Sequence, residues 1–341
     1  MEESNPEDCF ICRGLFARVD RYSAKAARAA KRYQFKTFAV GIVMPEGVQE
    51  REDELRSSLK MKGGESVKVE LARVTGKQVA RLTGKRQDKS KPDLSIVVDL
   101  QDSGVKTAAR PVFYHARYTK PRGVSQRREF CPDCGGKGCG ACGGLGFDRS
   151  PSVEAALRKR ILKEGEKAVF TWIGSEDRES LVLPPGRPFV VEVKNPHARK
   201  IASRFACKTS AGTVRVSGGR VLRAQPTALP KFRFRTRILA EASERVADDE
   251  LSELAKRLRG AEVRFDRPRH RSVTKKVYSV KAESRGKRLT IDAELDGGLP
   301  VKRFVSGELV SPSVSEVLKK EVRCRRFDIH RVTETGGFQF G

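Results

Sequence analysis

The chain has 341 residues, enough for two or three domains that each bury their own core. Its 70 lysines and arginines outnumber its 43 acidic residues and give a formal net charge of +27. A basic excess of this size, dispersed along the chain, predicts a polyanion as partner, most often a nucleic acid. The alternative is a basic surface that binds nothing, as in a salt-adapted or ribosome-associated protein.

The distribution of apolar residues argues against membrane insertion and secretion. The first eight residues are acidic and polar without a signal-peptide core, and no run of eighteen apolar residues exists. We therefore expect a cytoplasmic protein that does not bind a membrane. The eight cysteines then indicate metal binding, because reducing compartments disfavour structural disulfides.

The first segment of the chain, residues 1–34, contains one Cys-x-x-Cys pair and a predicted basic helix. Cys9 and Cys12 would supply half of a zinc site, and two packed or free thiols are the alternative. The helix is rich in alanine and is predicted over residues 23–33.

The next ninety residues predict a small layered α/β module. Apolar alternation indicates a strand over 35–44, and charged or amphipathic patterns indicate helices over 48–61 and 66–82. Apolar runs over 94–100 and 111–118 indicate two more strands. Strands and helices in this order favour a layered module.

Two further Cys-x-x-Cys pairs follow, separated by a glycine-rich spacer: Cys131, Cys134, Cys139 and Cys142. Zinc prefers four thiolates in a tetrahedron, and glycines let the backbone turn tightly around the metal. We expect structural zinc here. The two pairs share one ion, or one of them combines with Cys9 and Cys12.

A polar loop after a helix (152–163) and a strand (170–173) carries two adjacent acids, Glu176 and Asp177. The loop is predicted to end in a turn at Pro184-Pro185-Gly186, before a strand over 189–193. Residues 187–237 contain thirteen lysines and arginines and one acid. A carboxylate at the lip of this basic strip would be held ionised where a polyanion lands. An ordinary solvated acidic turn is the alternative.

The later elements are mainly strands. A hairpin is predicted around Gly218-Gly219, and a helix over 248–258. Residues 231–240 alternate so that Arg233, Arg235 and Arg237 share one face and two phenylalanines share the other. Such interleaving suits RNA phosphates and stacked bases, or alternatively an edge strand with arginines in water.

Several of these segments together resemble one family, the archaeal and eukaryotic tRNA pseudouridine synthases of the tenth family. The loop resembles that family's catalytic loop through Gly174, Glu176, Asp177, Gly186, Arg187, Pro188, Phe189, Asn195 and Pro196. The other matching segments are 111–123, the cysteine-rich stretch leading to Ser152-Val153-Glu154, the basic 264–271, the third-motif strand beginning Gly297-Gly298-Leu299, and 311–318.

The resemblance implies the fold class and the domain limits. We expect an α+β protein in which a THUMP-like RNA-binding domain spans residues 35–125 and a zinc knuckle spans 126–147. A mixed α+β synthase domain would span 148–341.

The resemblance also implies the activity: isomerisation of uridine to pseudouridine at positions 54 and 55 in the TΨC arm of tRNA. Asp177 would act at the sugar with a cation, Lys302, buried beside it, and no catalytic cofactor or small-molecule substrate is expected. Substrate contacts are assigned to Phe234, Thr236, Leu299, Lys302, Arg178 and Arg187.

Three departures from the family pattern lie near this predicted site. Ser175 replaces an arginine that, in the family, helps hold the target nucleotide out of the RNA stack. Its loss should weaken substrate capture if Arg178 does not take over that role. Thr236 and Pro300 stand where tyrosines are expected, and Phe234 would supply a ring without a hydroxyl.

The alternative function is therefore a non-catalytic tRNA-binding protein that retains the fold. A redox or DnaJ-like chaperone is a third reading that leaves the basic region unexplained. Nothing in the sequence suggests an obligate dimer, so we expect a monomer.

Overall fold

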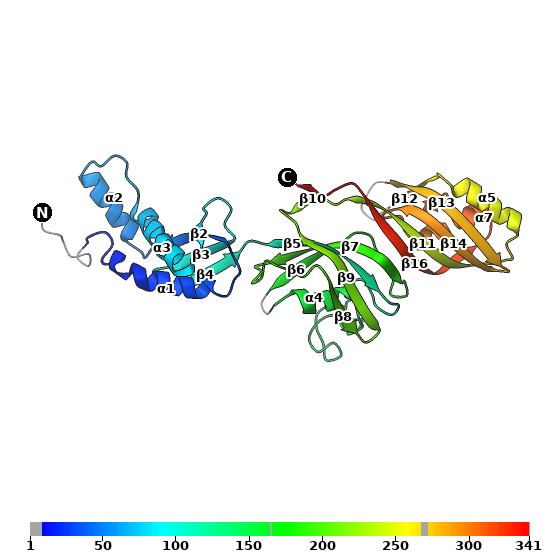
Figure 1. The fold of residues 1–341 in the computed structure, drawn as a ribbon, viewed down its shortest axis with the longest axis horizontal. Coiled ribbons are helices and arrows are strands. Elements are labelled where there is room, and N and C mark those ends of the chain that lie inside the picture. The colour runs from blue at the N-terminus through cyan, green and yellow to red at the C-terminus, as the bar shows by residue number, and fades with distance from the viewer. Residues whose placement is uncertain (1–8, 164–165, 267–271, 341) are drawn as a thin grey trace. The chain divides into compact units, whose positions relative to one another are not determined.

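The computed structural model describes residues 9–163, 166–266 and 272–340. It divides into two compact units (Figure 1). The N-terminal unit contains residues up to 112 together with 163–167 and 193–200. The C-terminal unit contains 113–162, 168–192 and the chain from 201 onward. The protein is of mixed α+β class, as expected from the sequence.

Within its described residues, the N-terminal unit is an α/β layer of three α-helices and four strands. Its elements are η2 (Phe16–Arg18), α1 (Val19–Ala30), β1 (Thr37–Val43), α2 (Val48–Ser58), α3 (Val67–Thr83), β2 (Arg86–Gln87), β3 (Leu94–Asp99) and β4 (Val105–Ala109). The strands run in the order β2-β1-β3-β4, with β1 parallel to both of its neighbours and β4 antiparallel to β3.

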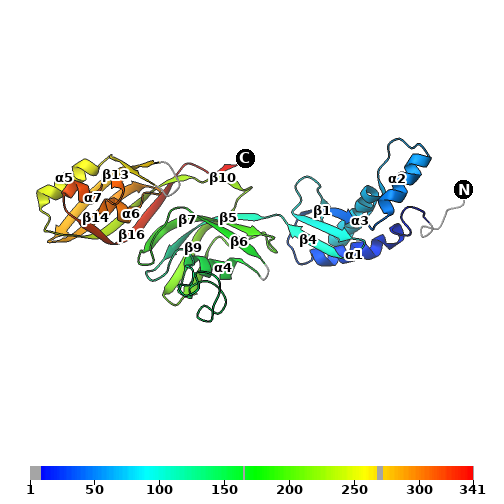
Figure 2. The ribbon, with the colours of Figure 1, turned by 180° about the vertical axis from the view of Figure 1, so that it is seen from behind.

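The core of this unit forms because its helices and strands each bury one face. Along β3, Leu94, Ile96 and Val98 are buried and alternate with half-buried residues. Helices α1 and α3 pack against each other and against the sheet, and Figures 1 and 2 show them beside it. Ser66 caps α3 by accepting a hydrogen bond from the backbone N–H of Val69. The predicted order of helices and strands in this module is confirmed through β3.

The strand predicted over 111–118 belongs to a different sheet from the rest of that module. It forms β5 (Val112–Lys120), which pairs antiparallel with β9 in the large sheet of the C-terminal unit. The predicted limits of 35–125, 126–147 and 148–341 therefore do not coincide with the two compact units and stay predictions.

The C-terminal unit is dominated by strands. Its helices are α4 (Val153–Ile161), α5 (Asp248–Leu258), α6 (Val301–Ser306) and α7 (Val314–Leu318). Its strands, besides β5, are β6 (Lys167–Trp172), β7 (Val182–Lys194), β8 (Phe205–Thr209), β9 (Gly212–Val221), β10 (Pro226–Ala228), β11 (Lys231–Ala242), β12 (Glu262–Phe265), β13 (Val273–Arg285), β14 (Arg288–Asp296), β15 (Val310–Ser311), β16 (Val322–Thr335) and β17 (Gln339–Phe340).

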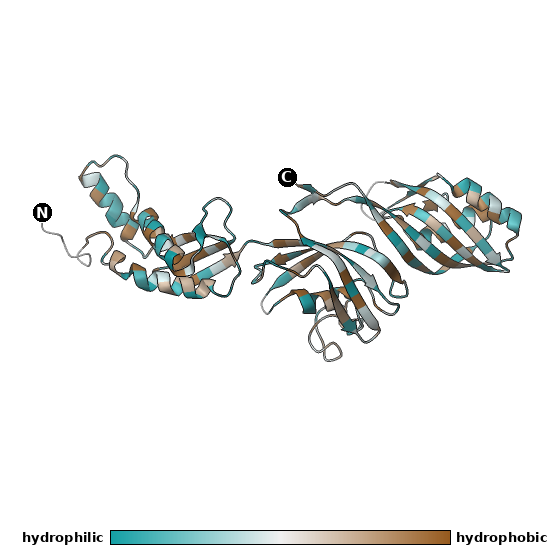
Figure 3. Cartoon of the chain, viewed as in Figure 1, coloured by the Kyte–Doolittle hydropathy of each residue, from teal (hydrophilic) through white to brown (hydrophobic). Residues whose placement is uncertain are grey.

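One extended sheet organises this unit, with eleven strands among the residues that the structure describes. Its order is β15-β12-β13-β14-β11-β16-β7-β5-β9-β8, with β6 paired to β7. Hydrophilic and hydrophobic residues alternate along β11, β13, β14 and β16, as the colours of Figure 3 show. The buried face includes Ile238, Ile291 and Phe327, while the arginines of β11 point to the other face, as the sequence predicted.

Three local predictions in this unit were wrong. Pro184-Pro185-Gly186 lies inside β7 rather than in a turn; both prolines are exposed, so their missing N–H groups leave no buried acceptor unsatisfied. Gly218 and Gly219 lie inside β9, where its pairing with β5 shifts register, and do not form a hairpin turn. A Cβ on Gly219 would stand 1.9 Å from the Tyr114 hydroxyl, whereas Gly218 has open space around it and a positive φ of 63°.

The third error is the strand predicted after Gly297-Gly298-Leu299, which is the helix α6. Pro300 stands at its N-cap, where no helical N–H is required. Val301, Phe304 and Val305 are buried on one face, at helical spacing. Gly307 ends the helix with a positive φ of 83°.

Candidate active site

The loop between β6 and β7 is anchored by a buried ion pair. Glu176 Oε2 lies 2.9 Å from Arg187 Nε, and their side chains are 0% and 2% exposed. The distance defines an ion pair, although the Nε–H is not aligned for a hydrogen bond. Arg187 also donates from Nη1 to the carbonyl of Ile173, 3.3 Å away. Glu176 is thus a structural carboxylate, not half of a solvated acidic turn.

Two side chains complete the surroundings of Glu176. The hydroxyl of Tyr118 donates to Glu176 Oε1, and Gln126 Nε2 donates to Glu176 Oε2 at 3.1 Å. Gln126 Nε2 also lies within hydrogen-bond distance of the carbonyl of Gly174 at 3.1 Å. Burial raises the pKa of Tyr118 well above its ordinary value, so this hydroxyl keeps its proton.

A buried lysine fixes the path of the loop itself. Lys120 Nζ donates to the carbonyls of Asp177, Arg178 and Ser180 at 2.9, 3.3 and 2.6 Å. Burial lowers the pKa of this ammonium group to about 8. The three carbonyls converge on one point, so Lys120 holds the backbone that carries Asp177.

A second tie joins this loop to β16. Arg122 forms a bidentate pair with Asp328 at 2.6 and 2.8 Å and donates to the carbonyl of Glu179 at 3.1 Å. Asp328 in turn accepts from the backbone N–H of Leu181 at 3.0 Å. The sequence contained Tyr118, Lys120 and Arg122 within a matching segment, but gave no sign that they hold the loop.

Gly174 leaves no room for a side chain at the start of the loop. Its φ is +85°, and a Cβ there would stand 2.2 Å from Arg187 Nη1 and 3.0 Å from the Phe232 ring. Both the backbone conformation and the close approach therefore require glycine. They bring the loop directly against β11.

Asp177 lies on the open side of the loop and meets α6. Its Oδ2 is 2.8 Å from Lys302 Nζ, and the two side chains are 40% and 57% exposed, respectively. The hydrogen bond to Asp177 raises the pKa of Lys302, so the lysine stays protonated. The predicted cation is therefore beside the carboxylate, but it is not buried. It is accessible because α6 buries Val301, Phe304 and Val305, while Lys302 lies on the exposed side of the helix.

This ion pair opens into a pocket of about 280 Å³ between the loop, β11, β16 and α6. The residues lining it are Gly174, Ser175, Asp177, Arg187, Phe232, Phe234, Gly298, Leu299, Pro300, Val301, Lys302, Arg303 and Phe327. Three phenylalanine rings line it together with the charged pair. Such a pocket fits a flat ring next to one carboxylate.

Five of the seven predicted catalytic and substrate-binding residues meet at this pocket: Asp177, Phe234, Leu299, Lys302 and Arg187. Phe232, Phe327 and Arg303 also line it. Phe232 is the second phenylalanine of the strand face predicted to suit stacked bases, whereas no sequence signal pointed to Phe327 or Arg303 as site residues. The guanidinium of Arg303 is engaged with the carbonyls of Glu308 and Leu309 at 2.8 and 3.1 Å.

The other two predicted residues lie elsewhere. Arg178 extends to Glu129 and Asp148, at 2.9 and 3.5 Å, and does not line the pocket beside Ser175. Thr236 is buried and donates to the carbonyl of Asp328 at 2.9 Å. Their contact with substrate stays a prediction that this arrangement does not favour. The basic segment predicted over 264–271 falls largely on residues 267–271, outside the described residues.

The cysteine-rich stretch forms one cluster that could hold a metal ion. The Sγ atoms of Cys131, Cys134, Cys139 and Cys142 all lie within 4.8 Å of one another. The backbone N–H groups of Gly138 and Gly146 donate to Cys134 and Cys142, each at 3.2 Å. The hydrogen bond from the Cys139 backbone lowers the pKa of the Cys142 thiol to about 6, whereas the pKa of the Cys131 thiol in the same cluster is raised to about 11.

The first Cys-x-x-Cys pair lies in the N-terminal unit. Cys12 is buried in that unit's core, and its backbone N–H donates to Cys9 Sγ at 3.4 Å. The four later cysteines thus come together without this pair. Metal binding by Cys9 and Cys12 stays a prediction. No helix within the described residues is long and apolar enough to cross a membrane.

Comparison with known proteins identifies the family. Residues 22–99 match the family model of the archaeal Pus10 THUMP domain, which covers the N-terminal unit from α1 to β3. The tRNA pseudouridine synthase Pus10 of Cenarchaeum symbiosum is 35% identical over 97% of this chain and 83% of the relative. That of Nitrosopumilus maritimus is 32% identical (95% and 85%), and that of Pyrococcus furiosus 29% (98% and 86%).

These matches extend over both units, so the protein is an isomerase of the pseudouridine synthase class. Within that class the chain belongs to the Pus10 family of tRNA pseudouridine synthases, and its N-terminal unit contains the THUMP domain. The resemblance drawn from the sequence motifs is confirmed.

Proposed function

We propose that this enzyme isomerises uridine to pseudouridine at positions 54 and 55 in the TΨC arm of tRNA, with Asp177 acting at the sugar. One observation carries the proposal for Asp177. It is the accessible carboxylate of a pocket with apolar rings, whereas the adjacent Glu176 is buried against Arg187. Of the two candidate acids in the loop, only Asp177 can meet a substrate.

The reaction breaks the N1–C1′ bond, turns the detached uracil and joins C5 to C1′, with release of the C5 proton. It needs an extruded nucleotide, an ionised carboxylate at the sugar and a surface that retains the free base. Asp177 would meet C1′ while the walls of Phe232, Phe234 and Phe327 hold the uracil. Lys302 would orient the carboxylate through its 2.8 Å contact. No cofactor is required for these steps.

The alternative is a tRNA-binding protein that retains the fold without catalysis. It is supported by the departures at Ser175, Thr236 and Pro300. The intact pair of Asp177 and Lys302 favours the enzyme instead.

The deciding experiment measures tritium release from unmodified tRNA transcript labelled at uridine C5. We expect release by the wild type and none above background by Asp177→Asn, while tRNA affinity stays within a few-fold. Primer extension over carbodiimide adducts then maps the modified positions. The matched control is Glu179→Gln, an acid of the same loop outside the pocket, which should retain release. Turnover by Asp177→Asn would remove Asp177 from the role, and a wild type that binds tRNA without release would favour the alternative.

We also propose that the four-cysteine cluster holds one structural Zn²⁺. A tetrahedron with Zn–S bonds of about 2.3 Å has edges of about 3.8 Å. The Sγ–Sγ distances are 3.8 Å for Cys131 to Cys139, 3.9 Å for Cys134 to Cys142 and 3.8 Å for Cys139 to Cys142. The donor set matches that of closed structural sites.

Zinc content measured by mass spectrometry tests this. One zinc per chain is expected, falling to near zero in Cys134→Ser with a lower melting temperature. Cys207→Ser, a buried thiol outside the cluster, should keep the metal. The double variant Cys9→Ser/Cys12→Ser tests whether the first pair also binds zinc. An unchanged zinc content in this variant would show that Cys9 and Cys12 do not.

A further inference from the structure

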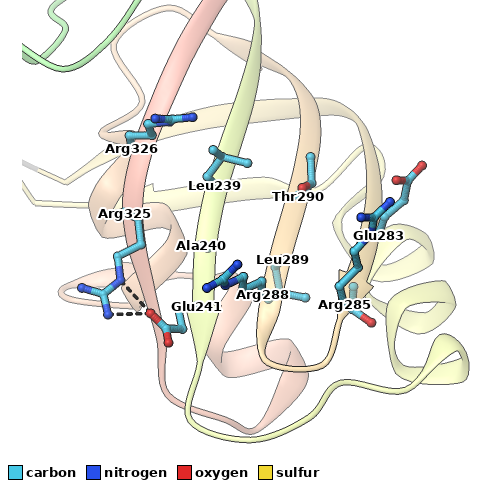
Figure 4. A pocket seen from close by; sticks show the side chains of 11 residues that line it. Leu239, Ala240, Glu241, Glu283, Arg285, Arg288, Leu289, Thr290, Arg325 and Arg326 are labelled. Atoms are coloured by element: carbon cyan, nitrogen blue, oxygen red, sulfur yellow. Dashed lines mark hydrogen bonds and ion pairs between the residues drawn. The ribbon is translucent and has the colours of Figure 1, made fainter. Parts of the chain in front are cut away.

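A second pocket, larger than the first, lies on the exposed face of the same sheet. It has a volume of about 670 Å³ and is formed by β11, β13, β14 and β16 (Figure 4). Its charged lining residues are Glu241, Glu283, Arg285, Arg288, Arg325 and Arg326. We call this set the arginine pocket. It contains four cations and two carboxylates.

The arginine pocket and the candidate active site lie on opposite faces of the sheet. Successive residues of a strand point to opposite sides. Phe327 lines the candidate active site, whereas the preceding Arg326 lines the arginine pocket. Leu239 is directly opposite Arg326 and lines the same pocket. The arginine pocket is therefore not part of the catalytic cavity.

Charge is balanced in the middle of this face but not at the arginine pocket. Arg235 and Arg237 are paired with Glu294 and Asp292, at 3.1 and 2.8 Å. At the pocket, Glu241 forms an ion pair with Arg325, which the dashed lines in Figure 4 mark. Within the described part of the chain, Arg285, Arg288 and Arg326 have no ion pair and no side-chain hydrogen bond. Three exposed guanidinium groups thus have no carboxylate within ion-pair distance, although Arg288 is near enough to help lower the pKa of Glu241 after Arg325.

Two of these arginines are directly opposite each other. Arg285 and Arg288 pair across the β13–β14 hairpin, where like charges are destabilising. A bound anion would relieve that repulsion. A planar guanidinium group can donate two hydrogen bonds to the oxygens of one phosphate. The phosphates of an RNA substrate would therefore suit this pocket.

We propose that Arg285, Arg288 and Arg326 bind backbone phosphates of the substrate tRNA outside the catalytic pocket. This inference rests on tRNA being the substrate. Among the described residues, β16 pairs with β7 only through Ile329 and Val182. Residues 323–327 therefore have no described strand partner on the side away from β11. An RNA chain that passes this side of β16 can meet Asp177 on one face and the arginine pocket on the other.

Fluorescence anisotropy with full-length unmodified tRNA at several KCl concentrations tests the proposal. The variant Arg288→Gln/Arg326→Gln should weaken binding about tenfold at 0.1 M KCl. The slope of log affinity against log salt should become shallower by about 1.4 to 1.8, because each phosphate contact contributes about 0.7 to 0.9. Lys256→Gln/Arg257→Gln on α5 changes net charge equally and should leave the slope as in the wild type.

A charge-retaining variant, Arg288→Lys/Arg326→Lys, should recover most of the slope, and circular dichroism checks that each variant is folded. If the glutamine variant binds tRNA with the affinity and the salt slope of the wild type, the proposal is overturned. Binding needs no turnover, so this result is separable from the proposed reaction. In the tritium assay the glutamine variant should raise KM and leave kcat unchanged.

Discussion

The two sides of the catalytic loop carry adjacent acids in opposite environments. Beneath the loop, Glu176 and Arg187 are almost fully buried together with Tyr118 and Gln126. Above it, Asp177 and Lys302 form a pair that is about half exposed. Both are ion pairs of similar length, 2.9 and 2.8 Å. Their surroundings, not their distances, separate a structural role from a chemical one.

The difference follows from desolvation. A charge buried with its partner becomes costly once the partner is removed, whereas an exposed pair is screened by water and contributes little to stability. The buried side should therefore govern the stability of the C-terminal unit, and the open side its activity. Trp172 is the only tryptophan, and it stacks on Phe170 beside Tyr118, so its fluorescence reports on this region.

The largest effect on stability is expected from Arg187→Met. It leaves the Glu176 carboxylate buried without a cation and should lower the free energy of unfolding by about 3 to 5 kcal/mol. Urea unfolding followed by Trp172 fluorescence measures the loss. The double variant Glu176→Gln/Arg187→Met should recover part of it. Asp177→Asn, the matched change on the open side, should cost less than about 1 kcal/mol. Equal losses on the two sides would break the comparison.

Lys302→Gln should reduce activity with little change in stability. Removing the ammonium leaves Asp177 accessible but no longer oriented, and we expect kcat to fall about 10- to 100-fold. Tritium release under single-turnover conditions measures the effect, and Lys302→Arg should restore part of it. Unchanged kcat in Lys302→Gln would show that the exposed ion pair is as dispensable for chemistry as for folding.

The smallest effect concerns pH and Lys120. Its pKa is about 8 in the folded protein and about 10.4 in an unfolded chain. Between these values the unfolded state binds the extra proton, so this group makes stability rise with pH. Its contribution approaches 1.4 kcal/mol per pH unit. Urea midpoints at pH 7.5 and 9.5 should show a smaller rise in Lys120→Met than in the wild type. The same rise in both proteins would contradict the assignment.

Local patterns in the sequence were sufficient for much of the fold and part of the site. The helix over residues 248–258 was predicted with its observed limits, because its apolar residues recur at helical spacing. The face assignment of β11 followed from simple alternation. Asp177 and Lys302, 125 positions apart in the chain, were brought together only through the family motifs, and they do meet.

Sequence patterns gave wrong predictions where one residue type is suited to more than one local structure. Gly219 suggested a turn, although its glycine makes room for Tyr114. Pro300 stands where a strand was expected, but it is the N-cap residue of α6, a position that needs no helical N–H. Arg178 was a reasonable substitute for the arginine missing at Ser175, but Glu129 and Asp148 attract it away from the pocket.

By itself, the sequence determined the basic character of the protein and its family, since composition and short motifs do not require the fold. It also predicted metal binding by the cysteines, which stays a proposal. The tertiary structure decided which cysteines share a cluster and which acid is accessible. It also placed Lys120 and Arg122 beneath the loop and left three arginines of the outer face unpaired. These depend on contacts such as Arg122 with Asp328, 206 residues apart in the chain. Burial and charge pairing at such separations arise only when the sheet is assembled.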